Sequence, residues 1–203
     1  MSAAEPPQSA NSAPSGGSEA AKPRAWGDHT SITSPRAAPV VTIAGARDIA
    51  VIQALAHDIW HRHYPGIISD AQIDYMLARS YNDEALHRYL TTIGSGLALA
   101  LRDEDAVGFI GWYRLEARLA MKLDKLYVRP EHHGEGIGRL LIEHVVAKAR
   151  AADCTAVTLN VNRNNVKAVR AYERCGFAIR ERGDFPIGNG FVMEDFIMER
   201  VVS

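Results

Sequence analysis

The sequence lacks the features that mark several large classes of protein. Its 203 residues carry a formal net charge of −1, so it has no basic excess of the kind that nucleic-acid binding usually needs. No stretch approaches the roughly 18 consecutive apolar residues of a membrane span. The N-terminus has no basic region followed by an apolar core, as a secretory signal has. These absences predict a cytoplasmic protein without nucleic-acid or membrane partners.

Cysteine is also scarce, and no metal-ligand pattern is present. Cys154 and Cys175 are the two cysteines and belong to no motif, so we expect reduced, packed thiols rather than a disulfide. His57, His61 and His63 lie close together in the sequence. No Cys or carboxylate pattern completes a zinc ligand set around them, so the sequence predicts no metal site.

Composition divides the chain into two parts. Residues 1–39 contain nine Ala, seven Ser, six Pro and three Gly, too little apolar surface to offset the entropy of ordering, which predicts a disordered tail. Residues 40–203 have the texture of a folded domain. The order of apolar patterns predicts an α+β fold: a strand at 40–44, helices at 47–64 and from 69 or 70, and a short helical turn near 86–90. Strands at 96–102, 106–116 and 119–128, a helix at 137–151, a strand at 155–161, a helix at 164–176, a strand at 177–183 and a last strand after 190 complete it.

Three glycines alternate with other residues directly after the strand at 119–128. Gly134, Gly136 and Gly138 are expensive in a helix, since each costs about 1 kcal/mol relative to alanine. They lie where a helix begins and offers unpaired backbone N–H groups. Without β-carbons, these groups are open to an anion, so the stretch predicts a backbone cradle for a diphosphate. The chain has no Gly-Lys pair, and the spacing is not that of a dinucleotide fingerprint, so both nucleotide motifs are disfavoured.

Two sequence blocks resemble the GCN5-related N-acetyltransferases, the GNAT family. LDKLYVRPEHHGEGIGRLL is similar to the family's acetyl-CoA signature, a strand followed by [Gln/Arg]-x-x-Gly-x-[Gly/Ala] at a helix start. NVNRNNVKAVRAYERCGF, about 30 residues further on, matches N-x-x-A-x-x-x-Y-x-x-x-G-F. The resemblance covers residues 40–200. It implies a mixed, mostly antiparallel sheet of six to seven strands, flanked by about four helices, with a splayed strand pair that binds acetyl-CoA.

The resemblance also implies a cofactor site. The pantetheine would pair with the backbone of the strand at 119–128, and the glycine stretch would hold the pyrophosphate. His133 departs from the family pattern, because Gln or Arg usually stands there. Asn160 and Asn165 would lie near the pantetheine amides, although one of them could equally cap a helix. The residues implied are Leu126, Tyr127, Val128, His133, Gly134, Glu135, Gly136, Ile137, Gly138, Arg139, Asn160 and Asn165.

For catalysis, the resemblance implies Tyr172 as the acid that protonates the leaving thiolate, and the backbone N–H of Val128 as the group that polarises the carbonyl. Strand alternation places Lys122, Asp124, Leu126 and Val128 on one face, which makes Asp124 the preferred general base. Glu116 is a second candidate. For each of these side chains a structural role, in packing or in an ion pair, is the competing interpretation.

The acceptor is left open by the sequence. A primary amine on a small molecule is the leading prediction, with protein N-termini or lysines behind it. A non-catalytic acyl-CoA sensor is the alternative from another class. Tyr64, Tyr75 and Tyr81 are candidates for an acceptor pocket or for the core, and Asp70, Asp74, Asp83 and Glu84 could attract a polyamine. A homodimer is the assembly that family habit suggests.

Overall fold

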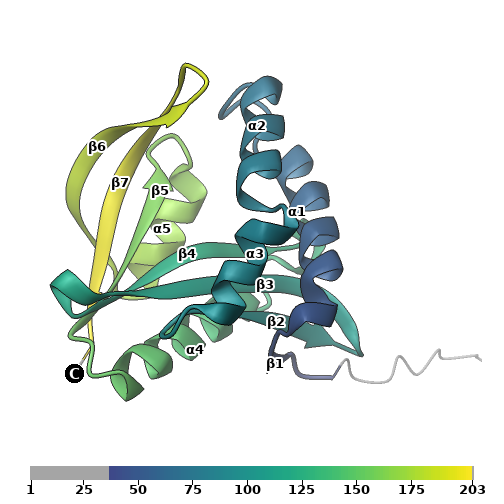
Figure 1. Cartoon of the computed structure of the whole chain (residues 1–203), viewed down its shortest axis with the longest axis vertical. Coiled ribbons are helices and arrows are strands. Elements are labelled where there is room, and N and C mark those ends of the chain that lie inside the picture. The colour runs from purple at the N-terminus through teal and green to yellow at the C-terminus, as the bar shows by residue number, and fades with distance from the viewer. Residues whose placement is uncertain (1–36, 203) are drawn as a thin grey trace, which may run out of the picture. The chain divides into compact units, whose positions relative to one another are not determined.

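The computed structural model describes residues 37–202, which form a twisted seven-stranded sheet with five helices (Figure 1). Of the predicted tail 1–39, all but the last three residues lie outside the described range. The elements follow in the order β1 (Val40–Ile43), α1 (Ile49–His63), α2 (Asp70–Ser80), α3 (Asp83–Thr91), β2 (Gly96–Arg102), β3 (Asp105–Leu115), β4 (Ala120–Val128), α4 (Ile137–Ala151), β5 (Ala156–Asn162), α5 (Val166–Arg174), β6 (Ala178–Gly188) and β7 (Phe191–Val201).

The strands lie in the order β1-β2-β3-β4-β5-β7-β6. Every neighbouring pair is antiparallel except β4 and β5, which are parallel. The parallel pair is joined by α4, as a crossover connection requires. The last strand, β7, lies between β5 and β6. This arrangement confirms the predicted α+β fold with a mixed, mostly antiparallel sheet.

Helix starts follow the local sequence. The Ser69 side chain accepts a hydrogen bond from the Gln72 N–H at 3.2 Å and begins α2, as a serine N-cap does. The Asn82 side chain accepts from the Ala85 N–H at 2.8 Å and begins α3. This second cap explains why α3 is a complete helix of 9 residues, where the sequence predicted only a short helical turn.

The strand β6 is longer than predicted. It continues past Gly183 to Gly188 and pairs with β7 along this length, including a Pro186–Val192 pair. The prediction ended the strand early because its apolar pattern fades there. β6 is an edge strand, where a proline and exposed polar residues are tolerated because one side of the backbone has no ladder to maintain.

Two hydrophobic clusters cover the two faces of the sheet. On one face, α4 and α5 pack over a cluster that includes Leu141, Val157 and Met198. On the other face, α1, α2 and α3 pack over a cluster that includes Trp60, Leu86 and Phe109. In the part of the chain from 37 to 202, no helix is long and apolar enough to cross a membrane.

Neighbouring leucines on α4 test which side of this helix stabilises the fold. The Leu141 side chain is 0% exposed, whereas that of Leu140 is 38% exposed. We expect Leu141→Ala to lower the free energy of unfolding by about 2–5 kcal/mol, because it removes buried contacts and leaves a cavity. Leu140→Ala should change it by less than about 0.5 kcal/mol. Urea unfolding of both variants measures the difference, and equal losses would contradict the packing of α4 described here.

Candidate active site

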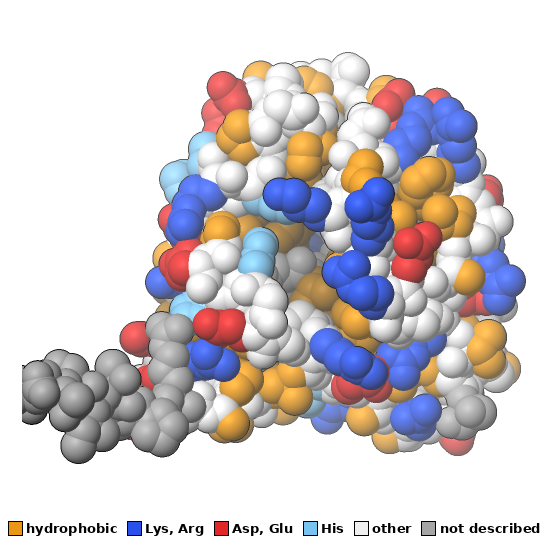
Figure 2. Space-filling model, turned by 180° about the vertical axis from the view of Figure 1, so that it is seen from behind, with side chains coloured by type: hydrophobic (Ala, Val, Ile, Leu, Met, Phe, Trp, Pro, Cys, Tyr) orange, Lys and Arg blue, Asp and Glu red, His pale blue; other side chains and the backbone are white. Residues whose placement is uncertain are grey.

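The parallel pairing of β4 with β5 stops early. It joins Ala120 to Ala156 and continues only as far as Leu123 and Leu159. Beyond these residues the two strands part, and this is the splayed pair that the resemblance predicted. Seen from behind, this side of the molecule is hollowed, with hydrophobic side chains in the hollow, Lys and Arg side chains along one rim and His side chains on the other (Figure 2).

Beyond the point where the strands separate, alternate peptide groups of β4 face the gap. Arg129 N–H donates to the Val107 carbonyl at 2.9 Å, and Val128 is opposite Gly108 in the register. Because antiparallel bonds alternate along a strand, the peptide groups of Leu126 and Val128 point away from β3. They therefore face the side from which β5 has parted, while those of Tyr127 are used by the ladder with β3.

A β-bulge interrupts β4 at Asp124. Leu123 pairs with Trp112 and Lys125 with Gly111, so Asp124 has no partner of its own on β3. The extra residue reverses the alternation of side chains. Leu126 and Val128 therefore pack towards the α4 cluster, whereas Asp124 and Lys125 lie on the face that α3 covers. The prediction that Lys122, Asp124, Leu126 and Val128 share one face is wrong, because it assumed unbroken alternation.

Asp124 is held by two neighbours on that face. Lys125 Nζ donates to Asp124 Oδ2 at 3.1 Å, and the Tyr89 hydroxyl of α3 donates to the same oxygen. Burial acts to raise the pKa of Asp124, but the Lys125 charge and these two hydrogen bonds hold it below its ordinary value. Asp124 is therefore an ionised carboxylate at neutral pH. Tyr89 and Lys125 were not predicted, because their roles depend on the bulge and on the docking of α3.

A cleft of about 540 Å³ opens at Asp124, between α3 and the strands β3 and β4. Lys125 is one of the residues that line it and is only 6% exposed. The residues that line the cleft are Arg79, Ser80, Ala85, Arg88, Tyr89, Thr92, Ile93, Ser95, Tyr113, Arg114, Asp124 and Lys125. Glu116, the second candidate base, is not among them. It lies in the turn after β3 with its side chain 76% exposed and 3.5 Å from Arg114.

The glycine stretch forms the turn that opens α4. Gly134 and Gly136 have φ angles of 84° and 81°, which only glycine adopts without strain, and Gly136 is the N-cap residue. A β-carbon added at either residue, or at Gly138, would meet no atom within 4 Å. The backbone of this turn is thus open on its outer side, as a cradle for a bulky anion must be.

The polar side chains of His133 and Glu135, at this turn, bind other groups of the protein. His133 Nε2 donates to the Val128 carbonyl at 2.9 Å. Glu135 Oε2 lies 2.6 Å from Arg102 Nη1 and 3.1 Å from His132 Nδ1. Ile137 is 1% exposed and belongs to the core, while Arg139 is exposed at the surface of α4. The turn is therefore fixed by its own side chains.

Asn165, which belongs to the second sequence block, caps α5 and contacts His63 of α1. The Asn165 side chain accepts from the Ala168 N–H at 3.2 Å and caps α5, which is the alternative that the sequence left open. Its Nδ2 lies 2.9 Å from His63 Nε2. Since the amide oxygen is occupied by the cap, Nδ2 is the donor and His63 the acceptor, so His63 is neutral. Burial, together with His133 and Lys167, lowers the pKa of His63 and favours this form.

Tyr172 lies on α5, half-buried against the α4 cluster, with its ring 5.8 Å from that of Phe177. Burial raises the pKa of its phenol, and Tyr64 at the end of α1 contributes. Among residues 37–202, none forms a hydrogen bond with the Tyr172 hydroxyl. The side chain is therefore a protonated donor whose hydrogen is available.

Asn160 joins Lys122 to a buried carboxylate. The Lys122 ammonium donates to Asn160 Oδ1, and Asn160 Nδ2 lies 3.4 Å from Asp195 Oδ2 on β7. Burial lowers the pKa of Lys122 and raises that of Asp195. Leu159 and Val161 pack towards α4, so alternation puts the Asn160 side chain on the opposite face, away from α4. Asp195 was missed because it is remote in sequence and belongs to no motif.

The remaining candidates separate into core and surface. Tyr64 and Tyr81 are 8% and 6% exposed and belong to the core, whereas Tyr75 is half-buried and its ring lies 5.4 Å from that of Phe191. The four acidic residues of α2 and α3 that could attract a polyamine do not line the cleft at Asp124. Within residues 37–202, no group of three or more His, Cys, Asp or Glu side chains could hold a metal ion.

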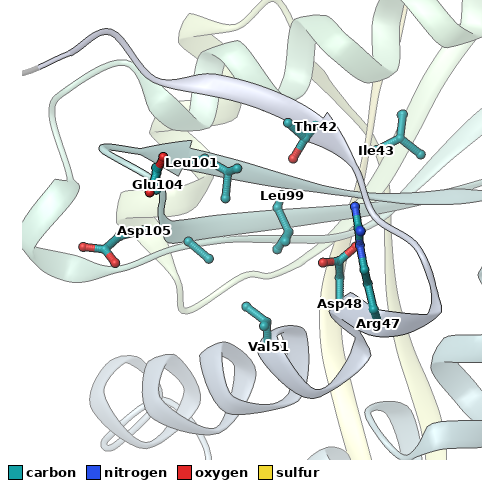
Figure 3. A pocket seen from close by; sticks show the side chains of 10 residues that line it. Thr42, Ile43, Arg47, Asp48, Val51, Leu99, Leu101, Glu104 and Asp105 are labelled. Carbon is teal, nitrogen blue, oxygen red and sulfur yellow. The ribbon is translucent and has the colours of Figure 1, made fainter.

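A second cavity, of about 390 Å³, lies between β1 and the start of α1 (Figure 3). It contains no residue predicted for catalysis or for the cofactor. Its polar lining includes Arg47 and the three acidic residues Asp48, Glu104 and Asp105, around the apolar side chains of Leu99 and Leu101.

Comparisons with known proteins agree with this geometry. The model of the Acetyltransferase (GNAT) family matches residues 54–177. An uncharacterized N-acetyltransferase of Mycobacterium bovis is 29% identical over 133 residues, 64% of this chain and 85% of that protein. The spermidine N(1)-acetyltransferase of Thermoplasma acidophilum is 27% identical over 154 residues, 72% of this chain and 90% of that protein.

Solved structures share the fold. The PaiA N-acetyltransferase of Thermoplasma acidophilum, in complex with coenzyme A, has a TM-score of 0.70 at 22% identity, over 81% of this chain and 99% of that one. Because the family model spans more than half of the chain, the protein belongs to the GNAT family. It is an N-acetyltransferase that uses acetyl-CoA.

Two glycines of the α4 turn should respond oppositely to alanine. Gly138 lies inside the helix without a positive φ, so Gly138→Ala should raise the free energy of unfolding by roughly 0.5–1 kcal/mol. Gly136 has φ 81°, so Gly136→Ala should lower it by about 1 kcal/mol. We expect a weaker Kd for coenzyme A in both variants, because each adds a β-carbon where the diphosphate would lie, and the larger loss in Gly136→Ala, where the backbone must also move. Urea unfolding and calorimetry measure both effects, and a stability loss in Gly138→Ala would contradict the geometry.

Proposed function

We propose that the protein transfers the acetyl group of acetyl-CoA to a primary amine of a small molecule, with both substrates bound together. The observation that carries the proposal is the position of Asp124: it lies just past the point where β4 parts from β5, and it lines a cleft of about 540 Å³. Clefts that bind small molecules commonly measure roughly 300–1,000 Å³. The similarity to a spermidine acetyltransferase supports a small amine as acceptor.

The cofactor residues fit acetyl-CoA in two ways. The peptide groups of Leu126 and Val128 face the gap left by β5, where pantetheine amides can pair with them as an added strand does. The open turn at Gly134, Gly136 and Gly138 exposes the N–H groups at the start of α4 to the diphosphate. Acetyl-CoA supplies the reactive thioester. In our proposal, Tyr127, Ile137 and Glu135 shape this site, Arg139 lies at its edge, and His133 positions the Val128 carbonyl.

The hairpin of β6 and β7 supports a small acceptor over a folded protein. The Tyr75 hydroxyl of α2 donates to the Ile187 carbonyl at 2.8 Å, and Gln72 Nε2 donates to the Val192 carbonyl at 3.3 Å. These contacts tie the hairpin tip to α2 on the acceptor side of the sheet (Figure 1). A lysine on a flat protein surface would have to displace them. The homodimer suggested by family habit and the cytoplasmic location remain predictions from the sequence.

The transfer needs three groups. The Val128 N–H, which faces the gap, is our candidate for stabilising the negative charge that develops on the thioester carbonyl oxygen. The C–N bond forms as the C–S bond breaks, and the electron pair leaves with sulfur. Tyr172 donates its hydroxyl hydrogen towards this thiolate. Because the pKa of Tyr172 is raised above its ordinary value, whereas a thiol titrates near 8.5, we propose that the hydroxyl acts chiefly by hydrogen bonding.

Asp124 receives the acceptor amine. Its carboxylate is ionised, so it attracts the amine and accepts a hydrogen bond from it, and a water passes the released proton to solvent. A carboxylate with a lowered pKa is a weak base at neutral pH. The amine therefore has to reach the site in its neutral form, and Asp124 orients it. Asn160, beside Lys122, completes the polar surface on this face.

Tyr172→Phe tests the leaving-group assignment. The substitution removes the hydroxyl and keeps the ring that packs against Phe177. We expect kcat to fall roughly 10²-fold or more, the usual range for a lost hydrogen bond to charge that develops in the transition state, with an unchanged Kd for acetyl-CoA. Stopped-flow thiol release and calorimetry separate the two quantities. Equal kcat in both proteins would remove Tyr172 from the mechanism.

The pH profile tests the role of Asp124. Its pKa is lowered, so it is fully ionised from pH 6 to 9 and adds no inflection there. An acceptor amine with a pKa of about 10.4 is mostly protonated over this range, and its neutral fraction rises close to tenfold per pH unit. We therefore expect kcat/KM to rise by the same factor. Asp124→Asn should lower the whole profile without changing its slope. A plateau above pH 7 that disappears in Asp124→Asn would instead identify a true general base.

A further inference from the structure

The cleft at Asp124 has an unbalanced charge. Four cationic side chains line it, Arg79, Arg88, Arg114 and Lys125, against the single carboxylate of Asp124. That carboxylate already accepts hydrogen bonds from Lys125 and Tyr89. A cleft built to receive a second positive charge on the acceptor would present carboxylates, since like charges repel in a partly desolvated site.

Three of the four cations already have a partner within the protein. Arg79 donates to the Ile187 carbonyl, Arg114 lies 3.5 Å from Glu116, and Lys125 is bound to Asp124 at 3.1 Å. Arg88 is different. It lies in the last turn of α3, and within residues 37–202 its guanidinium has neither a hydrogen bond nor an ion pair. A guanidinium offers a planar, bidentate fit to a carboxylate or a phosphate.

Nearby carboxylates do not restore the balance. Asp195 is buried at 6% exposure and lies next to Asn160, while the ammonium of Lys122 binds the same amide. On the helices, Asp74 lies 3.2 Å from His61 and Asp83 accepts from Gln53 at 2.8 Å. None of them lines the cleft.

We propose that the acceptor carries an anionic group besides its amine, and that Arg88 binds that group while Asp124 holds the amine. This deepens the proposed function, on which it rests, and it separates this protein from an enzyme whose acceptor is a polyamine. The shared chemistry is a carboxylate or a phosphate at the end of the acceptor away from the reacting nitrogen.

The test uses acceptors of equal chain length that differ at the far end. 5-Aminopentanoate ends in a carboxylate, pentylamine in a methyl group and cadaverine in an ammonium group. Thiol release from acetyl-CoA gives kcat/KM for each. We expect 5-aminopentanoate to be the best acceptor and cadaverine the poorest. O-Phosphoethanolamine against ethanolamine repeats the comparison with a phosphate, and the arm with the larger preference identifies the anion.

Arg88→Gln should lower kcat/KM for the preferred anionic acceptor roughly tenfold, the effect of one lost charged hydrogen bond. Its effect on pentylamine should stay within about twofold, as for an exposed charge without a partner. Arg47→Gln is the matched control. Arg47 is an exposed arginine in the second cavity (Figure 3), and its substitution removes the same charge. It should change neither acceptor.

Two results would overturn the inference and leave the proposed function standing: cadaverine as the best acceptor, or equal effects of Arg88→Gln and Arg47→Gln on the anionic acceptor. A different result would overturn the proposed function itself, namely no transfer to any amine, including a panel of polyamines and amino acids, while coenzyme A still binds.

Discussion

The early end of the parallel pairing between β4 and β5 is the constraint on which the site depends. After Leu123 and Leu159 the backbones of the two strands no longer pair, and the freed peptide groups need other partners. The β-bulge at Asp124 lies immediately past this point. Before the bulge, the odd-numbered residues of β4 point towards α4. After the bulge, the even-numbered residues do. The gap and the cleft at Asp124 therefore meet at the same few residues.

The two sides of this meeting point use different kinds of recognition. On the side of α4, peptide groups and a turn of glycines present a surface that depends little on side chains. On the side of α3, we propose that side chains carry the chemistry: Asp124 and Lys125 from β4, with Tyr89 and Arg88 from α3. A shared coenzyme needs the first surface to be constant, whereas the acceptor is defined by the second.

This division explains what the sequence could and could not predict. The glycine turn and the order of elements were predictable, because each depends on local periodicity and on backbone conformations that only glycine adopts. The faces to which the β4 side chains point were predicted wrongly, because the sequence of a strand does not reveal a β-bulge within it. The partners of Asp124 and the buried Asp195 were missed for a related reason. Tyr89 is 35 residues from Asp124, and their contact exists only after α3 docks.

The position of β7 between β5 and β6 has a consequence for how the chain acquires its shape. β7 follows every other strand of the described residues, yet it fills an interior place in the sheet. The strands from β1 to β4 pair with their neighbours in chain order. The hairpin that meets α2 makes a distant contact instead: Tyr75 and Ile187 are 112 residues apart, and closing so long a loop slows folding. The acceptor side of the sheet is thus closed by a contact between segments that are far apart in the chain, whereas β1 to β4 are joined by pairing between strands that follow one another.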